Sequence, residues 1–232
     1  MDGQPVGSRR DATAAAVEVL PLPLAETAAL VGEYRWVEDA LYRLLGQWVL
    51  DMPLAAVQVH LDSQSMRHAW HAELWAERLP VRDGADPDAL TVPSPPSAVL
   101  MAALSGSEVG AGVSGVSGAE GPPDTDPFDH PGALPRLAGL YRVALPRLVT
   151  SYERHLRAVA PVTDAPVGRA LRLVLNDEIE DWRAGEHLVQ RLVTRPHDVV
   201  AVHEFLQRLE SAVVAAGAVS GLVTFPDSVP GD

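Results

Sequence analysis

The residues with the clearest chemistry are two histidines, His68 and His71, in the stretch "RHAWHAELW" at 67–75. Residues three apart lie on one face of an α-helix, so the two imidazoles could hold one metal ion or bridge two. Two core histidines that form hydrogen bonds with neighbours such as Gln64 would have the same spacing. The residues themselves leave both interpretations open.

Acidic side chains are expected on the apolar faces of three other helices. The glutamates have apolar residues three and four positions away, which is the spacing of a shared helix face. An unpaired carboxylate in a dry core is costly, and a shared cation would remove that cost. With the histidines included, the candidate metal ligands are Glu38, His68, His71, Glu153, Glu178 and Asp181.

Each acidic candidate also has a simpler interpretation. A register error of one position would turn any of the three glutamates to solvent. Asp181 belongs to an acidic run at 177–186, most of which is expected to form a solvated helix face. Glu33 is the second choice for the place of Glu38, and His155 is expected at the surface.

The elements that would position these residues are helices. Apolar residues recur with helical spacing in five segments, 26–50, 54–79, 137–159, 167–194 and 199–216, and no convincing strand alternation appears. Pro53 suits the first turn of the second helix, and Pro80 closes it. Pro146 is expected to bend the third. The fold class predicted from these patterns is all-α.

The lengths of the connections predict how the helices are arranged. Short turns make one hairpin at 24–80 and a second within 135–217, which also holds the fifth helix. Between them lies a Pro/Gly/Ser-rich crossover loop, 81–134, in which "SAVLMAALSG" is expected to form a few helical turns. Residues 1–23 are expected to be a flexible arm and 218–232 a fraying tail, with one domain overall.

This pattern resembles the ferritin-like di-iron carboxylate superfamily, whose bundle consists of two antiparallel hairpins joined by a long crossover. A single Glu38 is followed 30 positions later by the pair His68–His71, and Glu153 is followed 25 positions later by Glu178–Asp181. The family pair is Glu-x-x-His. In this chain a histidine stands at the first position of the first pair, and an aspartate at the second position of the second pair.

The resemblance implies a mono- or di-metal site for Fe or Mn, and oxidation or hydroxylation of a small organic substrate with O₂. The alternative is a metal-free ferritin-like binding or accessory protein, whose inward polar residues form a structural network or a ligand pocket. A three-histidine site of the DinB type fits less well, because the sequence has no His-x-x-x-His.

Composition excludes several other classes of function. The chain has no cysteine, all 18 of its basic residues are arginine, and its net charge is −13. Thiolate chemistry and lysine Schiff bases are therefore excluded, and nucleic acid is not an expected partner. No signal peptide or membrane span is apparent, so a cytoplasmic location is expected. The expected partners are a small-molecule substrate or another protein, including a second copy in a homodimer.

Overall fold

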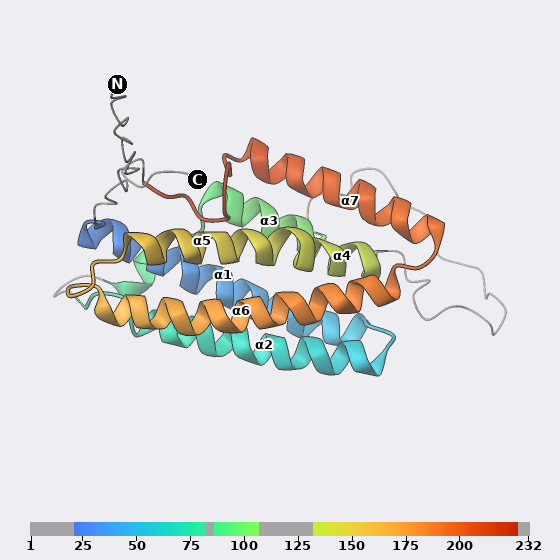
Figure 1. The fold of residues 1–232 in the computed structure, drawn as a ribbon, viewed down its shortest axis with the longest axis horizontal. Coiled ribbons are helices and arrows are strands. Elements are labelled where there is room, and N and C mark those ends of the chain that lie inside the picture. Colours follow the sequence, from blue (N-terminus) through green and yellow to red (C-terminus); the bar gives the residue numbers. More distant parts are fainter. Residues whose placement is uncertain (1–20, 82–85, 107–131, 227–232) are drawn as a thin grey trace, which may run out of the picture.

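A computed structural model describes residues 21–81, 86–106 and 132–226 of the 232-residue chain (Figure 1). All regular elements within these ranges are helical, which confirms the predicted all-α class. They are α1 (Leu24–Asp51), α2 (Ala55–Ala76), η1 (Pro87–Leu90), α3 (Pro95–Ser105), α4 (Ala133–Gly139), η2 (Leu140–Ala144), α5 (Leu145–Ala158), α6 (Ala165–Leu192) and α7 (Pro196–Ala215). The predicted N-terminal arm to residue 20, much of the predicted crossover loop and the last six residues lie outside the described residues.

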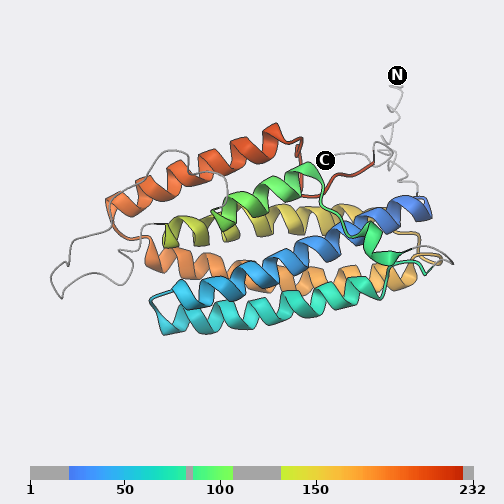
Figure 2. The same ribbon diagram turned by 180° about the vertical axis from the view of Figure 1, so that it is seen from behind.

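Two pairs of helices build the centre of the molecule. The ribbon shows α1 antiparallel to α2, and α5 antiparallel to α6, with α2 and α6 in contact (Figures 1 and 2). The helix α7 packs against α4 and α3 on one side of these pairs. Burial of the apolar faces between the pairs is the main source of stability for such helices.

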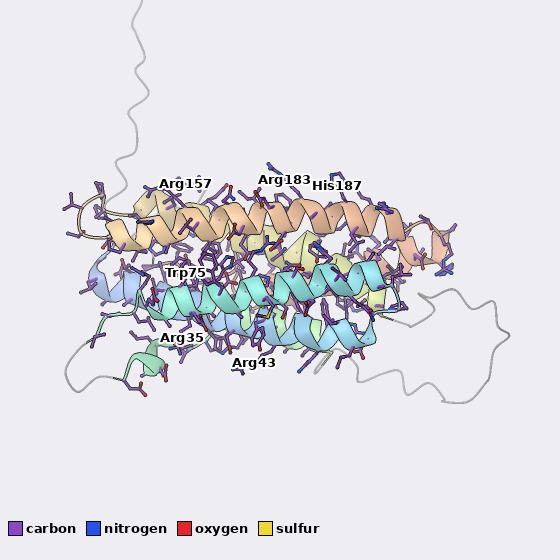
Figure 3. The ribbon with its side chains drawn as sticks, turned by 90° about the horizontal axis from the view of Figure 1, so that it is seen from below. Arg35, Arg43, Trp75, Arg157, Arg183 and His187 are labelled. Atoms are coloured by element: carbon purple, nitrogen blue, oxygen red, sulfur yellow. The ribbon has the colours of Figure 1, made fainter. Side chains whose placement is uncertain are left out.

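A cluster of aromatic rings fills the space between the two pairs. Trp75 of α2 and Tyr34 of α1 lie 5.3 Å apart between ring centroids, and Tyr152 of α5 stacks on Trp75 at 5.7 Å. All three side chains are fully buried, and Trp75 lies inside the bundle, whereas Arg157 and Arg183 lie along its outer edge (Figure 3). Each aromatic pair contributes about 0.5–1.5 kcal/mol beyond its buried area.

The predicted third helix is interrupted where Pro146 was expected to bend it. Proline cannot donate a backbone hydrogen bond, and its ring clashes with the carbonyl four residues earlier. The chain accommodates this with the π-helical turn η2, in which the Leu145 N–H bonds to the Leu140 carbonyl five residues back. The turn joins α4 to α5, so the segment begins at Ala133, earlier than predicted.

The helical turns predicted within "SAVLMAALSG" are present as α3, which lies beside α1 and α7. Glu33 of α1 ties the start of this helix to the bundle. Its carboxylate accepts hydrogen bonds from the Ser94 N–H at 3.2 Å and from the hydroxyls of Ser94 and Ser97. Buried hydrogen bonds to a charged group are stronger than neutral ones, so this contact anchors the connection between the two helix pairs.

The prediction that the tail frays after Gly217 is wrong for residues 218–226. Leu222 and Val223 are buried against the bundle, and their backbone N–H groups donate to the Ser151 hydroxyl at 2.7 and 3.3 Å. Gly221 permits this approach with φ +75°, because a Cβ there would lie 2.7 Å from the Ser151 oxygen. Within the described residues, no helix is long and apolar enough to cross a membrane.

Candidate metal centre

Four buried side chains from three helices meet in the interior. They are Glu38 of α1, His68 and His71 of α2 and Glu178 of α6. One ligand atom from each lies within 4.8 Å of all the others, and each of the four side chains is fully buried. The pairing of α1 with α2, and of α2 with α6, brings together residues that are up to 140 positions apart (178 − 38).

Three separations between the ligand atoms are similar. Glu178 Oε1 lies 3.3 Å from His68 Nδ1 and 3.2 Å from His71 Nδ1, and Glu38 Oε2 lies 3.5 Å from His71 Nδ1. Ligands at about 2.0–2.1 Å around a tetrahedral ion are separated by about 3.3 Å. These three separations therefore match the size of a single divalent ion. A further one, Glu38 Oε2 to His68 Nδ1, is only 2.5 Å and is a direct hydrogen bond.

Two outer contacts orient this cluster. The Tyr152 hydroxyl of α5 donates to Glu38 Oε1, and Asp177 Oδ2 lies 3.2 Å from His71 Nε2. A carboxylate on the second imidazole nitrogen is the usual support of a metal-binding histidine, because it fixes the ring and its tautomer. Both contacts leave Glu38 Oε2 and His71 Nδ1 facing the centre of the cluster.

His68 is supported differently. Its Nε2 lies 3.4 Å from the amide nitrogen of Gln64, whose Oε1 accepts a 2.7 Å hydrogen bond from the Tyr141 hydroxyl. Tyr141 reaches this position by lying over Gly185 of α6, where a Cβ would come within 1.9 Å of its ring. With the amide nitrogen toward it, His68 accepts at Nε2 and carries its proton on Nδ1, which faces Glu38.

The charges in the cluster depend strongly on one another. Burial by itself would lower the pKa of His71, but the Glu38 and Glu178 carboxylates raise it to about 11. Burial would raise the pKa of Glu38, but the neighbouring His71 and His68 lower it to about 2. The carboxylates and the histidines thus stabilise each other's charged forms, and a divalent cation would supply positive charge at the same place.

Asp181, one turn after Glu178, lies outside this group of four. Its Oδ1 forms a 2.8 Å ion pair with Arg67 of α2, and its side chain is only 6% exposed. Burial raises the pKa of Asp181 to about 6 despite the favourable charge of Arg67. Asp181 Oδ2 and Glu178 Oε2 are both buried without a hydrogen-bond partner in the described part of the chain. The side of the cluster toward Arg67 is therefore incompletely satisfied.

The prediction that Glu153 faces the interior is wrong. Its side chain is exposed, and the neighbouring Tyr152 points inward to Glu38 instead. On α5 the buried positions Leu148, Tyr152 and His155 are spaced by four and three residues, which defines a face that excludes position 153. Apolar residues lie on both sides of Glu153 in the sequence. A helix face that contains position 153 therefore appeared as apolar as the face that contains position 152.

Two further residues were placed incorrectly or missed from the sequence. His155, expected at the surface, is 1% exposed and packs against Tyr34 and Phe225. Glu33, the second choice for the place of Glu38, is buried but bonds to the start of α3, away from the cluster. The local sequence around Glu33 could not predict these hydrogen bonds, because the partners of Glu33 lie about 60 residues away in the sequence.

Comparison of the chain with protein-family models, curated proteins and solved structures finds no match.

Proposed function

We propose that this chain is a ferritin-like metalloprotein that binds one divalent ion, Fe or Mn, between Glu38, His68, His71 and Glu178. The convergence of these four buried ligand atoms within 4.8 Å carries the proposal. Two imidazoles and two carboxylates form a donor set that suits such ions, and their two negative charges would neutralise a divalent cation. Glu178 Oε2, which has no hydrogen-bond partner among the described residues, adds a buried acceptor on the same carboxylate.

The course of the chain supports the ferritin-like arrangement. The ribbon runs in one direction along α1 and α6 and in the opposite direction along α2 and α4–α5 (Figures 1 and 2). Between α2 and α4 the chain returns along the bundle through α3. Two hairpins joined by such a crossover are the arrangement of ferritin-like bundles.

The second half of the bundle favours one ion over two. The glutamate predicted on α5, Glu153, is exposed, and Tyr152 stands in its place. Asp181 pairs with Arg67, so a guanidinium cation already lies on the side where a second ion would need ligands. A second divalent cation beside Arg67 would be repelled and would lack a full set of donors.

The proposed reaction is oxidation or hydroxylation of a small organic substrate. A bound Fe or Mn ion would supply redox chemistry with O₂. The chain itself holds the ligands in place through Tyr152 and Asp177 and excludes bulk water, because all four ligands are fully buried. Asp177 is 28% exposed and contacts His71, so it lies where the cluster comes nearest to solvent.

Metal analysis tests this function first. Protein should be produced in medium supplemented with iron and manganese and purified without chelator or histidine tag. We expect about one equivalent of Fe or Mn per chain. Glu38→Gln and His71→Gln should each lose this metal while they keep their helical circular dichroism. Zinc in place of both, or less than about a tenth of an equivalent of any metal after reconstitution, would contradict the proposal.

A specific observation favours a second candidate, a metal-free protein in which the four residues form a structural network. His68 and Glu38 are already 2.5 Å apart, closer than two ligands of one ion, and Gln64 leaves the His68 proton on the Nδ1 that faces Glu38. Nitrogen NMR of labelled histidines distinguishes the two. A metal-binding Nδ1 loses its proton and shifts on addition of Zn²⁺, whereas the network keeps its signals unchanged at equal concentrations of protein and metal.

A small-molecule substrate, a protein partner and a homodimer stay predictions under either candidate, and so does the division of the chain into one domain with a long crossover.

A further inference from the structure

A second region that could bind a ligand lies between α2 and α6, at the end of the bundle where α2 ends and α6 begins (Figure 3). A cavity of about 530 Å³ opens there, within the size range of pockets for small organic molecules. Its walls are apolar and include Leu74, Pro166 and Leu173, and two arginines, Arg78 and Arg169, complete the lining. Among the residues that the structure describes, no acidic side chain lines it.

The described part of the chain compensates the positive charge in this cavity only weakly. Within the described residues no ion pair involves Arg169, and the Nε of Arg78 is buried without a hydrogen-bond partner. The partner of Arg78, Glu77, is 68% exposed, so the pair is weak. Asp164, at the start of α6, directs its carboxylate to the backbone N–H of Ala160. A chain with net charge −13 thus keeps two guanidinium groups beside an apolar cavity.

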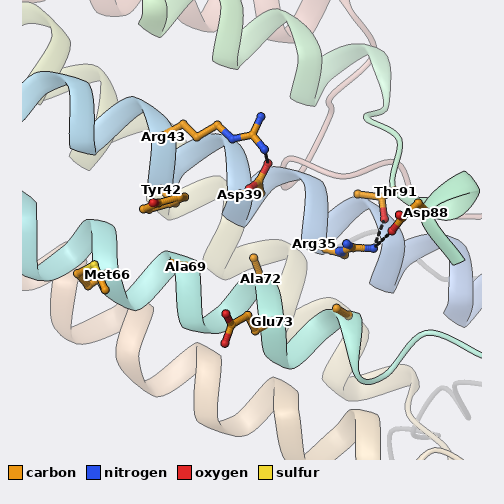
Figure 4. A pocket seen from close by; sticks show the side chains of 11 residues that line it. Arg35, Asp39, Tyr42, Arg43, Met66, Ala69, Ala72, Glu73, Asp88 and Thr91 are labelled. Carbon is orange, nitrogen blue, oxygen red and sulfur yellow. Dashed lines mark hydrogen bonds and ion pairs between the residues drawn. The ribbon is translucent and has the colours of Figure 1, made fainter.

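A larger cavity on the α1–α2 face provides the contrast. It has a volume of about 630 Å³ and also contains two arginines, but each already has an acidic partner. Arg43 pairs with Asp39 at 2.8 Å, and Arg35 pairs with Asp88 and bonds to Thr91 (Figure 4). Glu73 lines that cavity as well. A bound anion there would have to displace existing ion pairs, whereas the α2–α6 cavity requires no such exchange.

The α2–α6 cavity lies along the same two helices as the cluster. Leu74 is one turn after His71 on α2, and Leu173 is one turn before Asp177 on α6. Arg78 follows His71 by seven residues, a rise of about 10 Å along the helix. An extended apolar chain held by its charged end at the arginines therefore has the length to reach toward the cluster.

We propose that the α2–α6 cavity binds an apolar organic acid, with its carboxylate between Arg78 and Arg169 and its tail directed along the helices toward His71. Arginine binds carboxylates with charge-assisted, often bidentate hydrogen bonds, and the apolar walls bury the tail. As a binding site this stands on the cavity alone. As the anchor for a substrate it rests on the proposed metal function.

The binding test uses metal-free full-length protein with octanoate as probe and 1-octanol as a neutral probe of equal chain length. We expect titration calorimetry to show octanoate binding at least about tenfold more tightly than octanol. Arg78→Gln and Arg169→Gln should each weaken octanoate about tenfold, and the double variant more. The matched control Arg172→Gln removes the same charge from α6 outside the cavity and should leave the affinity unchanged.

Several outcomes overturn the site. Octanol binding as tightly as octanoate would show that the arginines play no part, and an equal loss in Arg172→Gln would reduce the effect to net charge. Inorganic phosphate binding as tightly as octanoate would make it a simple anion site. Thermal melts of each variant identify any that fail to fold. Arg169→Gln is the variant least expected to misfold, because the Arg169 side chain is exposed.

The orientation is tested separately in protein loaded with Mn²⁺. Paramagnetic broadening should be stronger for the terminal methyl of octanoate than for the methylene next to its carboxylate, because the methyl lies nearer the cluster. Equal or opposite broadening would overturn the orientation while leaving the binding site intact. If no Mn²⁺ binds, the metal function fails and the calorimetric result still decides whether the acid binds.

Discussion

The two helix pairs of this bundle contribute unequally to the cluster. The α1–α2 pair supplies Glu38, His68 and His71, whereas the second pair, α5 with α6, supplies only Glu178. The second pair also buries a histidine, His155, but places it among aromatic rings with its Nδ1 unpartnered in the described structure. Equivalent burial therefore has opposite consequences in the two regions.

The pKa values express this difference. Burial alone lowers the pKa of His155 to about 4, with no carboxylate of the described residues to oppose it. His71 is also buried, yet Glu38 and Glu178 raise its pKa to about 11. The protonated imidazole is thus favoured at His71 and disfavoured at His155. The comparison shows that a histidine in a core indicates a cation site only where buried carboxylates converge on it.

The largest expected effect separates the two glutamates that the sequence predicts in the second half. Glu178→Gln removes a negative ligand and should weaken metal binding by more than about a hundredfold, whereas Glu153→Gln changes only an exposed side chain. Competition with a coloured chelator measures both affinities. Equal losses in the two variants would mean that the cluster is not the metal site.

The inward face of α5 could not be predicted from the sequence, whereas that of the other long helices could. Helical spacing predicted the five long helices, the inward histidines and Glu38, because large apolar residues recur without ambiguity around them. On α5 apolar residues lie on both sides of position 153, and the π turn η2 before Pro146 shifts the helix that follows. Periodicity cannot resolve one position in that case.

Contacts between distant segments were also beyond the sequence. The ion pair of Arg67 with Asp181 joins residues 114 positions apart, and the bond of Tyr152 to Glu38 spans the same separation. Neither has a local signature, since each depends on how α2 meets α6 and how α1 meets α5. The cavity at Arg78 and Arg169 arises from the same packing.

Acid should destabilise the second region through His155. The unfolded chain binds a proton at this residue near pH 6.5, but the native state binds it only near pH 4. The native state therefore holds fewer protons in this range, and the free energy of unfolding should fall by up to about 3 kcal/mol as the pH decreases from 7 to 4. Urea unfolding at several pH values measures this decrease.

His155→Leu should flatten this part of the pH profile, because the titrating group is gone. The control His203→Leu, at an exposed position of α7, should leave the profile of the original chain unchanged. If His155→Leu retained the full decrease in stability between pH 7 and 4, acid sensitivity would have another source.

A smaller effect tests the contact that α5 makes with the cluster. Tyr152→Phe removes the hydroxyl that donates to Glu38, and such outer contacts change metal affinity by about ten- to a hundredfold. Tyr34→Phe is the matched control, because its ring packs against Tyr152 while its hydroxyl faces the Ser151 carbonyl at 3.4 Å. A Tyr34→Phe variant as weak as Tyr152→Phe would assign the effect to packing.

The smallest expected effect concerns the ion pair between Arg67 of α2 and Asp181 of α6. Arg67→Ala leaves Asp181 buried without its partner, so the pKa of Asp181 rises further and the carboxyl takes up a proton. Because Arg67 is 33% exposed, the loss in unfolding free energy should be only about 1 kcal/mol. Arg43→Ala breaks an exposed pair with Asp39 and should lower the unfolding free energy by only a few tenths of about 1 kcal/mol. If Arg67→Ala also allowed a second equivalent of metal to bind, the guanidinium rather than the missing glutamate would be what limits the site to one ion.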